Sequence, residues 1–165
     1  MQAEQLRSFS DYNAWATARV YDAVAALPPE ERAKKRQAAF FGSIVGTLNH
    51  LLVVDRIWMG RIEGKPPARI VLDEIVSEHL GDLRALQEAE VRRIAEFCQS
   101  LEEADLGRVV HYTGGGRDFA DPLGRLLAHL FNHQTHHRGQ IHALILEAGA
   151  KPPPLDYLYY LRAAG

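Results

Sequence analysis

Apolar residues recur every three or four positions along several stretches of the chain, a spacing that predicts amphipathic helices. One such stretch covers about residues 4–27 and ends before two consecutive prolines. Another begins near residue 76 or 80 and continues to residue 101, with Cys98 on its apolar face. We therefore predict two long helices that each bury one face, and we expect Cys98 to behave as a small buried apolar side chain.

A third predicted helix, residues 43–63, is apolar on nearly every side. It opens with a serine, which is a favourable N-cap, and Gly64 follows it at the position that commonly takes a left-handed conformation. Such a helix is expected to be buried on several sides or covered by a second subunit. Its conspicuous polar residues are His50 and Asp55.

Each of these polar residues needs a partner, because an unpaired polar group in a protein core is destabilising. His50 can bond to a backbone carbonyl as an ordinary core histidine, or it can serve as a metal ligand, and we favour the metal ligand. For Asp55 we predict a salt bridge with an arginine such as Arg138, in preference to a role in orienting a ligand histidine.

The longest predicted helix lies between Asp121 and Gly149. We expect Asp121 as its N-cap, Pro122 at its first helical position and Gly149 as the left-handed residue that ends it. The residues between these limits would form roughly 40 Å of helix at about 1.5 Å per residue. Five of the chain's eight histidines fall inside this helix: His129, His133, His136, His137 and His142.

The positions of these histidines around the helix axis separate them. At about 100° per residue, His133 and His137 lie within or against the apolar stripe, one turn apart. His129 falls on its margin, whereas His136 and His142 fall outside it. Two imidazoles at positions i and i+4 on an inward face can bind one metal ion. A single histidine on an apolar face is more often an ordinary core residue, so the hypothesis needs a third ligand. The buried imidazole of the preceding apolar helix is our candidate.

The remaining segments are shorter. Residues 29–37 are polar and are expected to form a linker or a helical turn, and residues 65–76 form a proline-containing connection. Residues 108–121 place two extended pieces around three glycines, which predicts a β-hairpin rather than a phosphate-binding loop. The aromatic tail at residues 155–164 is expected to pack back over the helices or to form a dimer contact.

Composition narrows the class of protein. A length of 165 residues, 47% hydrophobic and 24% charged, is typical of one globular domain, which we place at residues 1–165. The net charge of −2 gives no basic surface for nucleic acid. No apolar run is long enough to span a membrane, and the N-terminus lacks the pattern of a signal peptide. With a single cysteine, the chain forms no internal disulfide, and we expect a cytoplasmic protein.

The sequence lacks the residues that several kinds of active site require. No Glu-x-x-His pair is present, so a ferritin-like di-iron site has no ligands. The sequence FGSIVG does not match the G-x-S-x-G nucleophile elbow. No glutamate follows His133 as in zinc proteases, which removes their usual general base.

The chain resembles the DinB-like family of metal-binding four-helix-bundle proteins. Three segments carry the resemblance: DYNAWA at residues 11–16, the apolar segment at 40–64 and HLFNHQTHHRGQI at 129–141. Thr17 stands where such proteins often have asparagine. The resemblance implies an all-α fold, namely an antiparallel four-helix bundle with a long crossover between the second and third helices and the small hairpin before the fourth. It also implies a homodimer.

The same resemblance implies a three-histidine metal site formed by His50, His133 and His137, the trio that burial and spacing also select. Three neutral imidazoles leave at least one coordination position for water or substrate. We expect a divalent ion, zinc or nickel first and iron next, because imidazole suits all three.

Relatives with this fold include transferases that use low-molecular-weight thiols, so thiol transfer to a small-molecule substrate is our first hypothesis. Hydrolysis by a metal-activated water is the second. A non-enzymatic metal-binding stress-response protein is the third. His129, His136 and Asp55 are candidate general bases by proximity, and Gln140 is placed to hydrogen-bond a ligand or substrate.

Overall fold

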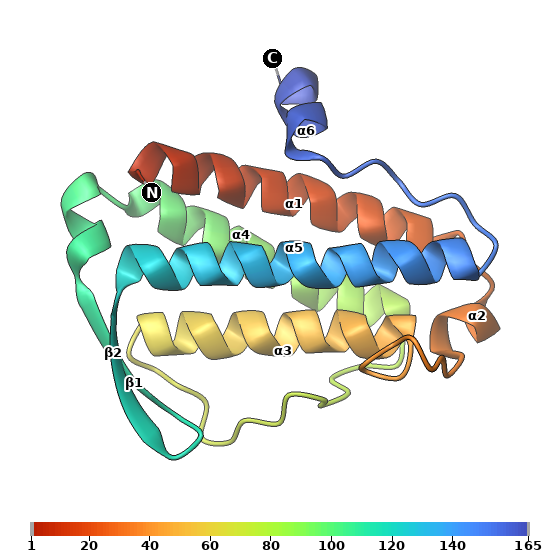
Figure 1. The fold of residues 1–165 in the computed structure, drawn as a ribbon, viewed down its shortest axis with the longest axis horizontal. Helices are drawn as coiled ribbons and strands as arrows, with labels where there is room; N and C mark the ends of the chain where they lie inside the picture. The colour runs from red at the N-terminus through yellow and green to blue at the C-terminus, as the bar shows by residue number, and fades with distance from the viewer. Residues whose placement is uncertain (1, 165) are drawn as a thin grey trace.

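The computed structural model describes residues 2–164, and four long helices dominate it (Figure 1). They are α1 (Ala3–Ala25), α3 (Ile44–Ile62), α4 (Leu80–Ser100) and α5 (Leu123–Glu147). Helix α1 packs against α4 and α5, and α3 packs against the same two helices. The predicted long helices are therefore present, with the expected limits to within a few residues. Among residues 2–164, no helix combines the length and the hydropathy that a membrane span requires.

The helices differ in direction from a simple antiparallel arrangement. Helices α1 and α5 run one way in Figure 1, and α3 and α4 run the other way. Each long helix therefore has one parallel and one antiparallel neighbour among the helices it packs against. The crossover at residues 63–79 is the physical reason, because it returns the chain along the molecule before α4 begins.

Two short helices and a 3₁₀ turn complete the helical part: α2 (Pro29–Ala33), η1 (Glu103–Gly107) and α6 (Tyr157–Ala164). Helix α2 is the helical turn expected in the polar segment. The aromatic tail packs back on α1, where the ring of Tyr157 stacks on Phe9 with a centroid separation of 5.0 Å. The Tyr157 hydroxyl also hydrogen-bonds Ser8 at 2.5 Å. Of the two alternatives for the tail, packing over the helices is the one observed.

The predicted hairpin is confirmed. Strands β1 (Val109–Gly114) and β2 (Arg117–Pro122) pair antiparallel, with Gly114 opposite Arg117. The two residues of the turn, Gly115 and Gly116, have φ values of +56° and +76°. Positive φ at both central positions is the requirement of the tight turns that join twisted strands, and glycine meets it without strain.

The start of α5 differs from the prediction by one or two residues. Pro122 has an extended backbone (φ −60°, ψ 136°) and still pairs with Val109 of β1, so the helix begins at Leu123. Asp121 is not the N-cap, because its carboxylate accepts a hydrogen bond from the Tyr112 hydroxyl at 2.9 Å. Strand pairing therefore holds both residues outside the helix. At the other end, Gly149 has the expected positive φ of +82°.

The interior consists of two apolar clusters with a polar layer between them. One cluster lies where α1 ends and α3 begins, and the other lies at the opposite end of the helices. Between the clusters each long helix contributes buried polar residues: Asn13, Thr17, Asp55, Gln87, Glu90, Gln134 and Arg138. Cys98 belongs to the second cluster as an apolar side chain, and burial raises its pKa to about 12.

The predicted salt bridge between Asp55 and Arg138 is wrong. Among residues 2–164 no ion pair joins them. Gln87 donates a hydrogen bond to Asp55 at 2.8 Å instead, and Arg138 donates to Asn13. The two amide side chains are visible in the sequence. The helix packing that places α4 and α1 beside these two charged groups is not.

Candidate metal centre

Helices α3 and α5 bring three imidazole rings to one point. His50 comes from α3, and His133 and His137 come from consecutive turns of α5. One nitrogen from each ring lies within 4.8 Å of the other two, and the ring centroids are 4.3 to 5.0 Å apart. His50 and His137 are buried and His133 is half-buried. The trio selected from the sequence is therefore one cluster, held on two rigid helices.

A backbone carbonyl in the crossover orients the ring of His50. Its Nδ1–H donates to the carbonyl oxygen of Leu72 at 2.8 Å, so the lone pair is on Nε2. That Nε2 lies 3.1 Å from Nε2 of His133. The two alternatives considered for this residue are therefore compatible with each other, since a histidine bonded to a carbonyl also points its free nitrogen into the cluster.

Gln140 orients the ring of His137. The Nδ1–H of His137 donates to Oε1 of Gln140 at 2.7 Å, and the Gln140 amide lies 3.2 Å from Nε2 of His136. The free nitrogen of His137 is therefore Nε2. A hydrogen bond to the second ring nitrogen is the usual way in which proteins fix the tautomer of a metal-binding histidine. Gln140 was expected to bond a ligand or substrate, and it bonds the His137 ring.

His133 has the least satisfied ring of the three. Its Nδ1 is buried and has no hydrogen-bond partner among residues 2–164. Its Nε2 faces the lone pair of His50, so a proton or a cation must lie between these two nitrogens to avoid repulsion. A cation held at that point would remove the repulsion. The residues therefore fit a bound metal ion.

The electrostatics keep the three rings neutral. Burial lowers the pKa of His50 and of His137 below the ordinary value. Burial lowers the pKa of His133 further, to about 3, and the neighbouring His137 and His50 rings add to that decrease. A neutral imidazole is the form that binds a metal. The cluster therefore presents neutral nitrogen donors at physiological pH.

The spacing of the nitrogens is compatible with one ion. Two nitrogens that each lie about 2.1 Å from a metal are at most about 4.2 Å apart. The 3.1 Å pair of His50 and His133 meets this limit, and the widest separation in the cluster, up to 4.8 Å, exceeds it by about 0.6 Å or less. Three imidazoles suit zinc, nickel and iron alike.

An aromatic ring covers one side of the cluster. Phe41 stacks on the His50 ring with centroids 3.7 Å apart, and its edge meets His137 at 5.6 Å. The chain reaches this position because Gly46 lets it pass close to α3: a Cβ at Gly46 would lie 2.1 Å from the carbonyl oxygen of Phe41. This contact could not be predicted from periodicity or motifs, because it depends on the path of residues 39–43.

Replacing Gly46 by alanine is therefore expected to lower the free energy of unfolding by about 2 kcal/mol or more, because the new methyl group collides with backbone. Gly81→Ala is the matched control, since a Cβ at that helical glycine meets nothing within 4 Å. Urea unfolding of both variants measures the difference. If Gly46→Ala unfolds at the same denaturant concentration as the wild type, the close approach is wrong.

A hollow of about 480 Å³ opens beside the cluster. Its walls come from α3, the crossover, the hairpin and α5, and they include Val54, Ile57, Trp58, Ile70, His129 and His133. A volume in this range suits a small-molecule ligand. Of the candidate bases, His129 lines this hollow with its ring against Trp58 at 4.9 Å. Asp55 is 0% exposed in the polar layer and does not line it.

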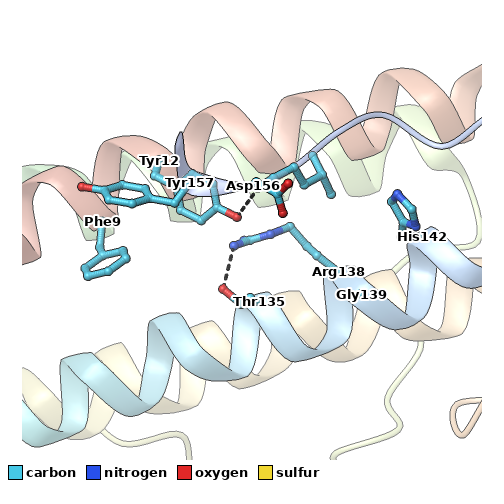
Figure 2. A pocket seen from close by; sticks show the side chains of 9 residues that line it. Phe9, Tyr12, Thr135, Arg138, Gly139, His142, Asp156 and Tyr157 are labelled. Atoms are coloured by element: carbon cyan, nitrogen blue, oxygen red, sulfur yellow. Dashed lines mark hydrogen bonds between the residues drawn. The ribbon is translucent and has the colours of Figure 1, made fainter. Parts of the chain in front are cut away.

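A second hollow, of about 350 Å³, lies on another face of α5 and contains none of the three clustered histidines (Figure 2). Figure 2 shows Arg138 extending from α5 toward α1 and the C-terminal tail, with His142 at one side. Tyr12 closes part of this hollow by donating a hydrogen bond to the carbonyl of Leu155 at 2.7 Å. His142 thus faces away from the three-histidine cluster, as its angular position predicted.

Three neutral imidazoles from two neighbouring helices that meet beside an open hollow define a helical protein with a histidine cluster compatible with metal binding. More specifically, the chain belongs to the DinB family, whose model matches residues 1–165. The family resemblance drawn from the three sequence segments is thereby confirmed.

Two relatives agree with this assignment. The chain is 29% identical over 158 residues to "Protein DinB" of Bacillus subtilis (strain 168), a match that covers 92% of this chain and 90% of that protein. A crystal structure of a DinB-like protein from Bacillus cereus ATCC 10987 superimposes with a TM-score of 0.63 at 20% identity. That match covers 88% of this chain and 94% of the other, and it shows a shared fold.

Proposed function

We propose that the four long helices form a bundle that holds a divalent metal ion on His50, His133 and His137. The observation that supports this most directly is the meeting of three neutral rings, two of them with a fixed tautomer that leaves Nε2 free. Zinc or nickel is the first expectation and iron the next.

We further propose that the protein is an enzyme of the thiol-transferase type. A bound divalent ion would favour the deprotonated form of a thiol, which is the nucleophilic form. The hollow beside the cluster supports an enzymatic role over a purely structural one, because a structural site is normally closed by protein ligands. His129 lines this hollow and is the residue best placed to accept the thiol proton.

The residues around the hollow define what the substrate meets. Val54, Ile57 and Ile70 provide apolar contacts, and Phe41 shields the far side of the His50 ring. An apolar wall excludes water and strengthens electrostatic interactions inside the site. We infer a small organic substrate and a low-molecular-weight thiol. The homodimer implied by the family stays a prediction.

The test of the enzymatic proposal is a thiol-transfer screen on the full chain loaded with zinc or with nickel. Cysteine, glutathione and 2-mercaptoethanol would each be combined with an aromatic electrophile whose product absorbs light. The expected result is a rate above the uncatalysed reaction that disappears on chelation and falls about 10²-fold or more in His129→Gln. A metal-loaded protein that accelerates none of these reactions would count against thiol transfer while leaving metal binding intact.

A further inference from the structure

The hollow beside the metal centre contains one charged side chain, Arg61. It lies in the last turn of α3, and its guanidinium packs over the rings of Trp58 and Tyr112 at 4.6 and 4.9 Å. One of its terminal nitrogens donates to the carbonyl oxygen of Thr113 at 3.1 Å. Two aromatic rings and a backbone bond thus hold the guanidinium in the same hollow that His50 and His133 line.

The charge of Arg61 has no partner of opposite sign. Among residues 2–164 no carboxylate forms an ion pair with it. The acidic residue nearest in sequence, Glu63, is bound by Arg93 at 2.7 Å. The Nε of Arg61 is also buried without a hydrogen-bond partner. Arg61 is half-buried, and an arginine held in a hollow without a counter-ion is well suited to bind an anion.

We propose that Arg61 binds the carboxylate of the small molecule that occupies this hollow. The apolar body of that molecule lies along Val54, Ile57 and Ile70, and its opposite end reaches the imidazole cluster. The proposed function implies that this opposite end is a thiol, and the inference rests on the proposed function for that part. The carboxylate is inferred from Arg61 alone. A single guanidinium matches a carboxylate, whereas a phosphate dianion is usually held by several cations or N–H groups.

A purely structural role is the competing explanation. Arg61 joins α3 to the hairpin through Thr113 and Tyr112, so its removal can loosen the hairpin whatever the ligand. A loosened hairpin weakens the binding of charged and neutral ligands alike. Binding of a carboxylate by Arg61 instead predicts a difference between a carboxylic acid and its amide, two ligands of nearly equal shape.

The experiment therefore compares hexanoate with hexanamide on the full chain, first with metal removed by chelation and then zinc-loaded. The indole N–H resonance of Trp58, identified by comparison with Trp15→Phe, reports binding by NMR because Trp58 lines the hollow. The expected result without metal is that hexanoate binds about tenfold or more tightly than hexanamide, in line with a charge-assisted hydrogen bond. Equal affinities in the wild type overturn the proposal.

Variants separate Arg61 from the rest of the site. Arg61→Met is expected to remove the preference for hexanoate and to leave the affinity for hexanamide within about twofold. Arg61→Lys is expected to retain part of the preference, because it keeps the charge and loses the planar fork. Arg84→Met is the matched control, since that arginine pairs with Asp22 and Glu88 away from the hollow. A preference for hexanoate that survives Arg61→Met overturns the proposal.

Two further probes test the ligand class and the dependence on the proposed function. Hexyl phosphate that binds more tightly than hexanoate through Arg61 overturns the assignment to a carboxylate. On the zinc-loaded protein, 6-mercaptohexanoate is expected to bind more tightly than hexanoate. If only this last gain is missing, the anion site stands and the thiol proposal fails. If only the acid–amide difference is missing, the thiol proposal stands and the anion site fails.

Discussion

Replacing His133 by alanine is expected to abolish stoichiometric binding of zinc and nickel. Loss of a residue that hydrogen-bonds a metal ligand already weakens metal binding about 10–100-fold. Loss of the ligand itself should weaken metal binding by more than that. The wild type is expected to bind about one ion per chain and to gain about 2.7 kcal/mol of stability at a metal concentration 100 times Kd. For a chain of this size that gain raises Tm by roughly 5–10 °C. Metal analysis and thermal unfolding with and without metal measure both effects.

The control for this prediction is His142→Ala. His142 is on the same helix but lines the hollow on the other face, so its removal should leave metal content and the metal-induced rise in Tm unchanged. His50→Ala should behave like His133→Ala, because the two nitrogens are 3.1 Å apart. Equal metal content in wild type and His133→Ala would exclude His133 from the site.

The site was predictable from the sequence because two features are local. The i, i+4 spacing of His133 and His137 fixes their relation on any helix, and the apolar surroundings of His50 mark it as buried. The groups that orient these rings differ in the same way: one is close in sequence and the other is distant. Gln140 is three residues from His137 and was expected to hydrogen-bond a ligand or substrate, whereas the Leu72 carbonyl comes from a loop whose path no periodicity specifies.

The predictions that failed concern contacts between segments that are far apart in the sequence. Pro122 and Asp121 have the composition of a helix start, but pairing with β1 keeps them extended. Arg138 and Asp55 have opposite charges on facing helices, yet each bonds to an amide side chain from another helix. The long helices follow from the apolar pattern, whereas their directions depend on the crossover, whose composition does not specify where it leads.

The polar layer contains a buried carboxylate, Asp55, whose effect on stability does not depend on the three-histidine cluster. It lies between two apolar clusters, and at its centre the Asp55 carboxylate is wholly buried. Burial, with a smaller contribution from the nearby Glu90, raises the pKa of this carboxyl to about 7, although Gln134, Gln87 and Arg138 favour the charged form. The balance shows that burial outweighs the stabilising partners, so ionised Asp55 destabilises the fold.

Asp55→Asn is therefore expected to raise the free energy of unfolding at pH 8 by about 2–4 kcal/mol. Below about pH 4 the carboxyl is protonated in both the folded and unfolded chain, and Asp55 imposes no penalty. Between about pH 4 and 7 the unfolded chain loses the proton while the folded chain retains it, so wild-type stability falls as pH rises, by up to about 1.4 kcal/mol per unit. Above pH 7 the penalty is constant. Urea unfolding from pH 4 to 8 measures the difference between the two proteins.

The difference between variant and wild type is the quantity to follow, because the three clustered histidines titrate with the opposite sign. Their lowered pKa values make the folded chain less stable as pH falls, and this contribution cancels in the comparison. Asp22→Asn is the control: Asp22 is exposed and paired with Arg84, so its replacement should change stability by less than about 0.5 kcal/mol at any pH. The asparagine side chain at position 55 keeps the shape of the aspartate and can accept the bond from Gln87. If Asp55→Asn raised the free energy of unfolding by the same amount at every pH, Asp55 would not be protonated in the folded chain at neutral pH. Packing, not charge, would then account for the effect.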